Sequence, residues 1–270
     1  MCCLFLAASS TVAIAQTSVV DLVNPIIGTN GMGHTFPGAC VPFGLVQLSP
    51  DTDTIPHNVD GKYQPRSYEY CAGYQHKDSS IVGFSHTHFS GTGHSDLGDI
   101  LIMPTTGTLK LNPGTATNPD GGYRSRFSHG TEISRPGYYE VMLADYGVKA
   151  QLTTTQRVGI HKYTYPTNSE NQRIILDMIH GIYNYDGKVL WTNIRVENDT
   201  LVTGYRITNG WARTNYTYFA MSFSKPITHY GCEEKAKVNY RGGYAKFNMK
   251  ENFPDIGGRK IVAYFDFDPK

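Results

Sequence analysis

The segment from Gly83 to Asp99 holds the densest group of side chains that can do chemistry. It contains histidines at positions 86, 88 and 94 and aspartates at positions 96 and 99, among serines, threonines and glycines. In an extended segment His86 and His88 point to the same side, because side chains alternate with a period of two. Glycines 91 and 93 let backbone amides approach a ligand, because glycine has no Cβ. Such a loop of hydrogen-bond donors and acceptors is typical of a site for a sugar or another polyol.

The same histidines are also candidate metal ligands. Two histidines on one strand face, completed by Asp96 or Asp99, form a ligand set that suits a metal-dependent β-barrel enzyme. No distant fourth ligand stands out, because four other histidines fit equally well: His34, His76, His161 and His180. Histidines in loops of this composition serve equally often as hydrogen-bond partners. The metal hypothesis stays open, and the sequence does not favour it.

Several carboxylates lie near the glycine-rich segments, which is compatible with a glycoside hydrolase. Such an enzyme needs two carboxyl groups that face each other across a sugar. The candidates are Asp51, Asp53, Asp78, Asp96 and Asp99. Aspartates in a sequence such as Asp51-Thr-Asp53 are also common turn residues. The G-x-S-x-G nucleophile motif, the P-loop and the dinucleotide fingerprint do not occur in the sequence.

Composition narrows the class of protein. The chain has 270 residues, of which 40% are hydrophobic and 17% are charged, so it can bury a core and does not have the composition of a disordered chain. Its formal net charge of +1 gives no electrostatic basis for binding nucleic acid or an anionic membrane. Aromatic residues make up 12% of the chain, which fits strands and also fits carbohydrate binding.

Residues 1–15 have the character of a signal-peptide remnant. An apolar run ends in Ala13-Ile-Ala15 before Gln16, although the usual basic region is missing and the run is too short to span a bilayer. Cys2 and Cys3 lie inside this segment, where one of them could carry a lipid. Cys40, Cys71 and Cys232 remain, which allow at most one disulfide and form no zinc pattern. We therefore expect an exported protein (periplasmic, cell-surface or extracellular) without a transmembrane segment, whose single domain covers residues 16–270.

The elements that must position these side chains are strands. Residues 19–60 contain too many prolines and glycines for a helix and are expected to form loops. Short runs rich in β-branched and aromatic residues follow, separated by turn residues. They are Ile100–Met103, Tyr138–Leu143, Val148–Gln156, Ile160–Tyr165, Ile174–Ile179, Val189–Val196, Leu201–Thr208, Tyr216–Ser224, Lys235–Tyr240, Tyr244–Met249 and Ile261–Phe267. This spacing, without helical periodicity, predicts an all-β protein: an antiparallel β-sandwich of two packed sheets with few short helices.

Several long motifs, in order along the chain, resemble the amino-terminal domain of glycoside hydrolase family 92. They cover Asn24–Thr29, Gly33–Ala39, Pro42–Thr52, Gly73–Tyr74, Gly83–Gly93, Asp96, Gly98–Asp99, Arg135–Tyr139 and His161–Pro166. The resemblance extends over essentially the whole chain from residue 19 onward. The number and order of the motifs make it specific.

The resemblance implies part of a secreted, calcium-dependent, inverting exo-α-mannosidase that acts on N-glycans or mannans. Proteins of this family have an amino-terminal β-sandwich of the galactose-mutarotase-like supersandwich kind, followed by a helical (α/α) barrel domain that carries the catalytic acid and base. The present chain resembles only the first, so we expect a fragment that lacks the helical catalytic domain. We accordingly assign no catalytic residue and no metal ligand to this chain, and we expect most calcium ligands to lie outside it.

Within the resemblance, two loops are expected to form part of the pocket for α-mannoside glycans. The predicted substrate-binding residues are His34 and Phe36 in the first loop, and His86, His88, Ser90, Gly91, Thr92, Gly93 and Asp96 in the second. Facing a sugar or the helical domain, His86 and His88 should be partly accessible to solvent. The alternative is a free-standing carbohydrate-binding β-sandwich without hydrolase activity, in which the same loop binds sugar and does not cleave it.

Overall fold

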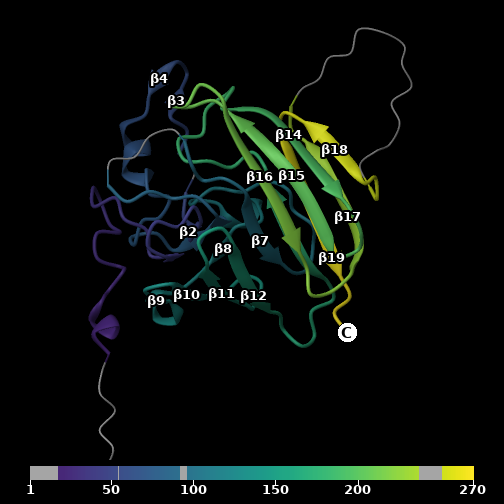
Figure 1. Cartoon of the computed structure of the whole chain (residues 1–270), viewed down its shortest axis with the longest axis horizontal. Helices are drawn as coiled ribbons and strands as arrows, with labels where there is room; N and C mark the ends of the chain where they lie inside the picture. The colour runs from purple at the N-terminus through teal and green to yellow at the C-terminus, as the bar shows by residue number, and fades with distance from the viewer. Residues whose placement is uncertain (1–17, 54, 92–95, 237–250) are drawn as a thin grey trace, which may run out of the picture.

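Three antiparallel sheets lie in layers, with the largest sheet in the middle (Figure 1). The computed structural model describes residues 18–53, 55–91, 96–236 and 251–270. The expected signal segment 1–15 and the expected strand Tyr244–Met249 lie outside these ranges. The middle sheet has the strand order β1 (Ala39–Cys40), β2 (Gln47–Asp51), β6 (Gly83–Ser85), β7 (Leu101–Thr105), β13 (Gln172–Asp177), β19 (Ile261–Phe267) and β17 (Ile227–Glu234).

Two four-stranded sheets form the outer layers. One has the order β12 (Gly159–Thr164), β11 (Val148–Thr154), β10 (Tyr138–Leu143) and β9 (Ile133–Arg135). The other has the order β16 (Asn215–Ser222), β15 (Leu201–Thr208), β14 (Val189–Val196) and β18 (Asp255–Gly258).

Short elements complete the fold. Two strand pairs are β3 (Asn58–Val59) with β4 (Lys62–Tyr63), and β5 (Ser80–Ile81) with β8 (Ser125–Arg126). The helical segments of the described residues are all 3₁₀ turns: η1 (Val19–Leu22), η2 (Pro65–Tyr70), η3 (Pro119–Gly121) and η4 (His129–Thr131). Within the described ranges, no helix has the length and apolar character needed to cross a membrane.

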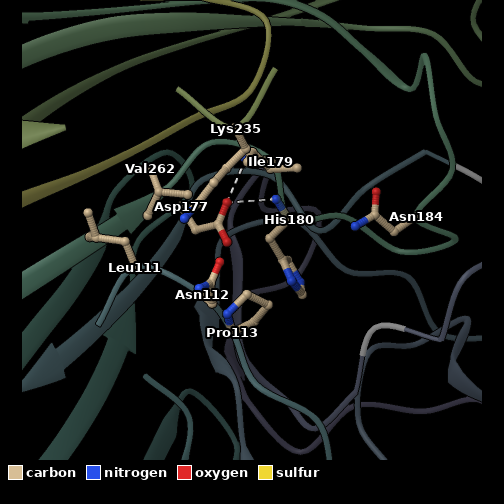
Figure 2. Close-up of a pocket in the computed structure, with 9 residues that line it drawn as sticks. All are labelled: Leu111, Asn112, Pro113, Asp177, Ile179, His180, Asn184, Lys235 and Val262. Atoms are coloured by element: carbon tan, nitrogen blue, oxygen red, sulfur yellow. Dashed lines mark hydrogen bonds between the residues drawn. The ribbon is translucent and has the colours of Figure 1, made fainter. Parts of the chain in front are cut away.

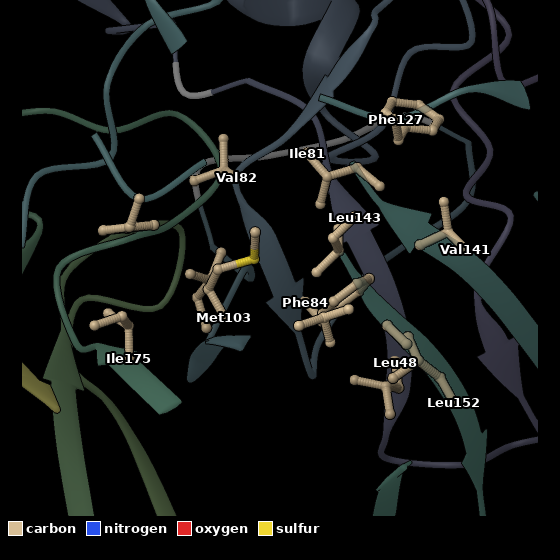
Figure 3. Packing of buried hydrophobic residues seen from close by; sticks show 14 of the residues in the cluster. Leu48, Ile81, Val82, Phe84, Met103, Phe127, Val141, Leu143, Leu152 and Ile175 are labelled. Atoms are coloured by element: carbon tan, nitrogen blue, oxygen red, sulfur yellow. The ribbon is translucent and has the colours of Figure 1, made fainter. Parts of the chain in front are cut away.

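Strands β7, β13 and β19 of the middle sheet are buried on both faces, because they carry consecutive apolar residues rather than alternating ones. In β7, Leu101 and Met103 pack toward the β9–β12 sheet, whereas Ile102 packs toward the β14–β18 sheet. The same alternation occurs in β13 and β19. Figure 3 shows the first of the two cores, where Leu48, Phe84, Met103 and Ile175 of the middle sheet lie near Val141, Leu143 and Leu152 of the outer sheet.

The predicted all-β, antiparallel sandwich is confirmed, and the predicted number of sheets is wrong. Every pairing between the named strands is antiparallel. The sandwich has three layers because strands such as Leu101–Thr105, with every residue buried, need a covering sheet on each side.

Individual strands follow the sequence prediction to different degrees. Tyr138–Leu143, Val189–Val196 and Leu201–Thr208 have the predicted bounds. Within the expected strand Lys235–Tyr240 the first two residues are not in a strand, and the rest lie outside the described ranges. Strand β17 was not predicted at all.

Candidate functional site

The structure brings the two predicted loops into contact. Strand β6 ends at Ser85, and the following residues leave the sheet and pass beside the loop that contains His34. The backbone N–H of Gly91 donates to the carbonyl oxygen of His34 at 2.8 Å. The rings of Phe36 and His88 lie with their centroids 5.4 Å apart. Residues 34–36 and 86–91, about fifty positions apart in sequence, therefore form one surface element.

His88 is the buried member of this element, with only 2% of the residue exposed, so the expectation that it is accessible to solvent is wrong. Its Nδ1 is 2.8 Å from the carbonyl oxygen of Gln47, and its Nε2 is 2.7 Å from Oδ1 of Asp51. Both ring nitrogens therefore lie within hydrogen-bond distance of acceptor oxygens. The chain turns after Ser85, and this turn carries the His88 ring inward.

Asp51, at the end of β2, is the centre of a buried polar network. It is completely buried and accepts hydrogen bonds from Nε2 of His88 and Nε2 of His180, each at 2.7 Å. The hydroxyl of Ser85 donates to its Oδ2 at 2.6 Å. Burial alone would raise the pKa of Asp51, but the charges and hydrogen bonds of His88 and His180 outweigh burial and hold that pKa below its usual range. Asp51 is therefore an ionised structural anchor.

Gly73 closes the network from one side. Its φ of +82° lies in the left-handed region, and a Cβ built on it would lie 2.0 Å from Oδ1 of Asp51. Any side chain at this position would displace the carboxylate from the two imidazoles. The backbone at residue 73 thus fits only glycine.

A second buried ion pair holds the other side of the loop. Arg206, on β15, is fully buried and donates to Oδ1 of Asp99 through Nε at 3.1 Å and Nη2 at 2.5 Å. The hydroxyl of Thr87 donates to Oδ2 of Asp99 at 2.8 Å. Burial opposes ionisation of Asp99, and Arg206 with Thr87 more than compensates, so the pKa of Asp99 is below its ordinary value.

His86 faces a different environment from His88, so the prediction that they share one face is wrong. Its Nδ1 is 2.7 Å from the carbonyl oxygen of Ile100, and its Nε2 is 3.0 Å from Nε2 of His161. Nδ1 of His161 lies 2.7 Å from the hydroxyl of Tyr163. One proton between the two Nε2 atoms satisfies both rings, so the pair is neutral. Burial lowers the pKa of His86 to about 4 and takes that of His161 well below its ordinary value.

This neutral pair makes stability depend on pH. The pKa of histidine is about 6.5 in the unfolded chain and about 4 for His86 in the folded protein. The folded state is therefore stabilised by the neutral His86 at pH values above 6.5. This contribution is lost as the pH falls from 6.5 toward 4, because the unfolded chain then binds the proton more tightly. We expect His86 to lower the free energy of unfolding by about 2 kcal/mol between pH 7.5 and pH 5. Urea unfolding at several pH values should show a shallower dependence for His86→Gln than for the unsubstituted chain. His229→Gln serves as the control, and equal slopes for His86→Gln and the unsubstituted chain would contradict the assignment.

The outer surface of the loop pair carries accessible groups. Phe89 is 55% exposed, and Ser90 and Gly91 are exposed beside it. The carboxylate of Asp96 accepts hydrogen bonds from the backbone N–H groups of Trp211 at 2.9 Å and Ala212 at 3.1 Å, which ties it to the β15–β16 connection. Trp211 is 76% exposed. Thr92 and Gly93 lie outside the described residues.

His34 holds the first loop in a left-handed backbone conformation, with φ of +54°. Its ring is 7% exposed and meets Tyr68 edge-on at 4.7 Å, and burial lowers its pKa. Its Nε2 has no hydrogen-bond partner among the described residues. The roles of His34, Phe36, His86, His88, Ser90, Gly91 and Asp96 in sugar binding stay predictions.

A small pocket lies on the other side of His180, and sequence reasoning did not identify it. It has a volume of about 80 Å³, and His180, Asp177, Asn184 and Lys235 are among its lining residues (Figure 2). Asp177 accepts hydrogen bonds from the backbone N–H groups of Ile179 at 2.6 Å and His180 at 3.0 Å. The aspartate at the end of a buried strand, three residues before a histidine, was the available signal.

The sequence matches the family model described as the glycosyl hydrolase family 92 N-terminal domain over residues 22–270. The fold is similar to a family 92 α-mannosidase from Bacteroides thetaiotaomicron solved in complex with mannoimidazole, with 41% identity, a TM-score of 0.78 and coverage of 92% of this chain and 30% of that one. A family 92 inverting mannosidase from the same species, strain VPI-5482, is 26% identical with a TM-score of 0.67, covering 94% and 30%. An uncharacterized secreted glycosidase from Arthroderma benhamiae is 28% identical over 170 residues, which are 60% of this chain and 19% of that relative.

Proposed function

The chain belongs to the glycosyl hydrolase family 92 N-terminal domain family, and from this premise we propose that it serves as the amino-terminal part of a secreted exo-α-mannosidase acting on N-glycans or mannans. Its contribution is a pair of loops at the sugar pocket, to which the described residues 34–36, 86–91 and Asp96 belong. The resemblance found in the sequence motifs is confirmed by the family match. The activity, the substrate and the secretion are the content of the proposal.

One observation carries the proposal: the two loops meet through the Gly91–His34 hydrogen bond and rest on the buried Asp51 network. Binding a rigid, hydroxyl-rich ligand benefits from groups held in place before the ligand arrives. The buried network supplies that rigidity, while Phe89 and Ser90 are exposed at its surface. An exposed aromatic ring beside an exposed hydroxyl suits a sugar, which has an apolar face and a polar rim.

On this proposal the catalytic carboxyl groups belong to the remaining length of the family proteins. Inverting hydrolysis needs an acid and a base about 6.5–9.5 Å apart with room for a water molecule. Asp51 and Asp99 are both buried and held by cationic or imidazole partners. Neither carboxylate has an open side for a water molecule. The chain spans 30% of the length of either solved relative, which leaves the larger part of such a protein to supply both groups.

Calcium, in the same proposal, is held mainly by residues outside this chain. Calcium takes six to eight oxygen ligands. Among the described residues, three side chains that can bind a metal lie close together: His76, His129 and Glu132. Two of these three ligands are nitrogen donors. That donor set does not fit calcium.

The experiment is an assay of mannose release from α-mannosides. The 270-residue chain alone should release no measurable mannose, with or without calcium. The same chain fused to the carboxy-terminal part of the Bacteroides thetaiotaomicron relative with 41% identity should be active, and a chelator should abolish that activity. Calcium-dependent turnover by the chain alone would contradict the proposal.

Substitutions in the loops of the active fusion protein test whether these loops contact the substrate or only support the fold. Phe89→Ala is expected to lower kcat/KM about tenfold, because it removes an exposed ring at the loop surface. Tyr218→Ala, at an exposed tyrosine on β16 in another layer, should leave kcat/KM unchanged. Equal effects of the two variants would contradict a pocket role. Glycan binding by the chain alone, with an inactive fusion, would favour the free-standing carbohydrate-binding module.

A further inference from the structure

Three side chains of a kind that bind metals converge away from the loop pair. Ligand atoms of His76, His129 and Glu132 all lie within 4.8 Å of one another. The backbone of His76 is held by a hydrogen bond, in which its N–H donates to the carbonyl oxygen of Thr29 at 2.8 Å. His129 and Glu132 come from η4 and the residue after it. The two imidazole rings lie close together, with centroids 3.9 Å apart and planes inclined by 32°.

Glu132 is the buried member, with 3% of its side chain exposed. Its Oε1 accepts hydrogen bonds from the hydroxyls of Tyr139 at 2.6 Å and Tyr74 at 2.9 Å. Its Oε2 lies 2.8 Å from Nδ1 of His129. Among the described residues, His129 is the ion-pair partner of this carboxylate. Within the part of the chain that the structure describes, the ion pair of Glu132 involves a histidine and neither lysine nor arginine, and such a buried carboxylate favours a cation at its open side.

The surroundings resemble a metal centre more than a chance contact. Carboxylates that bind metals are themselves oriented by hydrogen bonds from neighbouring groups. The two tyrosine hydroxyls do this for Glu132, and Tyr74 and Tyr139 are at most 1% exposed. His129, in contrast, is 37% exposed, so solvent reaches the group from one side. Two imidazoles and one carboxylate with an open position form a known zinc ligand set.

We propose that His76, His129 and Glu132 form a binding site for a divalent cation of the zinc class. Zinc bonds to these donors are about 2.0–2.2 Å long and tetrahedrally arranged, so two ligands of one ion are at most about 3.6 Å apart. Ligand atoms within 4.8 Å reach that limit by small side-chain rotations. The ion links η4 to the segment at residue 76 and neutralises Glu132. This site is independent of the mannosidase proposal.

The test measures Zn²⁺ binding to the untagged 270-residue chain by titration calorimetry, and Co²⁺ binding by visible absorption. We expect one Zn²⁺ per chain at this site, a raised melting temperature with Zn²⁺, and a Co²⁺ spectrum of nitrogen and oxygen ligands. His129→Ala and His76→Ala should each weaken Zn²⁺ binding at least about tenfold, as loss of groups at metal sites commonly does. Ca²⁺ should produce no such change.

Two control variants make the result specific. His229→Ala removes a histidine of matched exposure, 38% against 37% for His129, that lies near Glu251 and Asp266. Cys40→Ser removes an exposed thiol that can bind zinc by itself. Both should retain the affinity of the unsubstituted chain. Failure to bind Zn²⁺ at micromolar concentration would overturn the proposal, as would an equal loss of affinity in either control. His129→Ala changes a half-exposed side chain, so a folded variant is available even if His76→Ala does not fold.

Discussion

Replacing Asp51 with asparagine is expected to lower the free energy of unfolding by about 3–5 kcal/mol, the usual effect of removing one partner of a buried ion pair. The carboxylate accepts one N–H bond from His88 and one from His180, and both imidazoles are buried. An asparagine amide has one acceptor oxygen, so one imidazole N–H would face an amide N–H₂ group. Urea unfolding at pH 7 measures the change.

The control for this substitution is Asp120→Asn. Asp120 is 75% exposed and forms a surface ion pair with Arg126 at 2.8 Å. Exposed pairs contribute at most about 1 kcal/mol, so this variant should unfold close to the midpoint of the unsubstituted chain. A loss below about 1 kcal/mol for Asp51→Asn would show that the network is not an anchor. If Asp51→Asn cannot be purified folded while Asp120→Asn can, the expectation holds.

Arg206→Met should have a comparable effect through the second buried pair. It removes the guanidinium that neutralises Asp99 and that also donates to the carbonyl oxygen of Met178 at 3.3 Å. Leaving the buried Asp99 without its ion-pair partner should lower the free energy of unfolding by about 3–5 kcal/mol. Because Asp99 also accepts the hydroxyl of Thr87, amide hydrogen exchange in residues 86–91 should become faster.

The double variant Arg206→Met with Asp99→Leu tests whether the charge is the cause. With both charges gone, neither position 99 nor position 206 holds an unpaired buried ion, and a well-packed apolar pair is often as stable as the ion pair it replaces. The double variant should therefore recover part of the stability lost in Arg206→Met. A loss equal to the sum of the two single losses would show that packing, and not the unpaired charge, is responsible.

The sequence predicted most strands because their local pattern is strong. Tyr138–Leu143 alternates buried and partly exposed residues, which is the period that a sheet with one covered face requires. Strand β17 was missed because Gly231 and the acidic pair Glu233 and Glu234 interrupt its pattern. Strand β2 contains Pro50, a residue that argues against a strand in a local reading. Tertiary pairing overrides both local signals.

For the candidate site, the sequence identified the loops but not what holds them. Residues 34–36 and 86–91 were chosen correctly as neighbours, since their motifs contain the glycines and polar residues of a binding loop. Asp51 was read either as a turn residue or as a candidate catalytic carboxylate. Its bond to His180 joins positions 129 residues apart, which no local pattern reveals. His88 was expected at the surface because a single-sequence reading cannot tell a buried, hydrogen-bonded histidine from an exposed one.

The position of β19 in the middle sheet affects how the chain folds as it is made. β19 is the last strand of the described chain, yet it lies between β13 and β17 and pairs with both. Ribosomes add about 5–20 residues per second, so the residues of β13 are synthesised several seconds before those of its partner Ile261–Phe267. During that time the open edge of β13, rich in isoleucine and leucine, is a template for pairing with other chains. A factor that covers this edge of β13 until Ile261–Phe267 is made would therefore reduce such pairing.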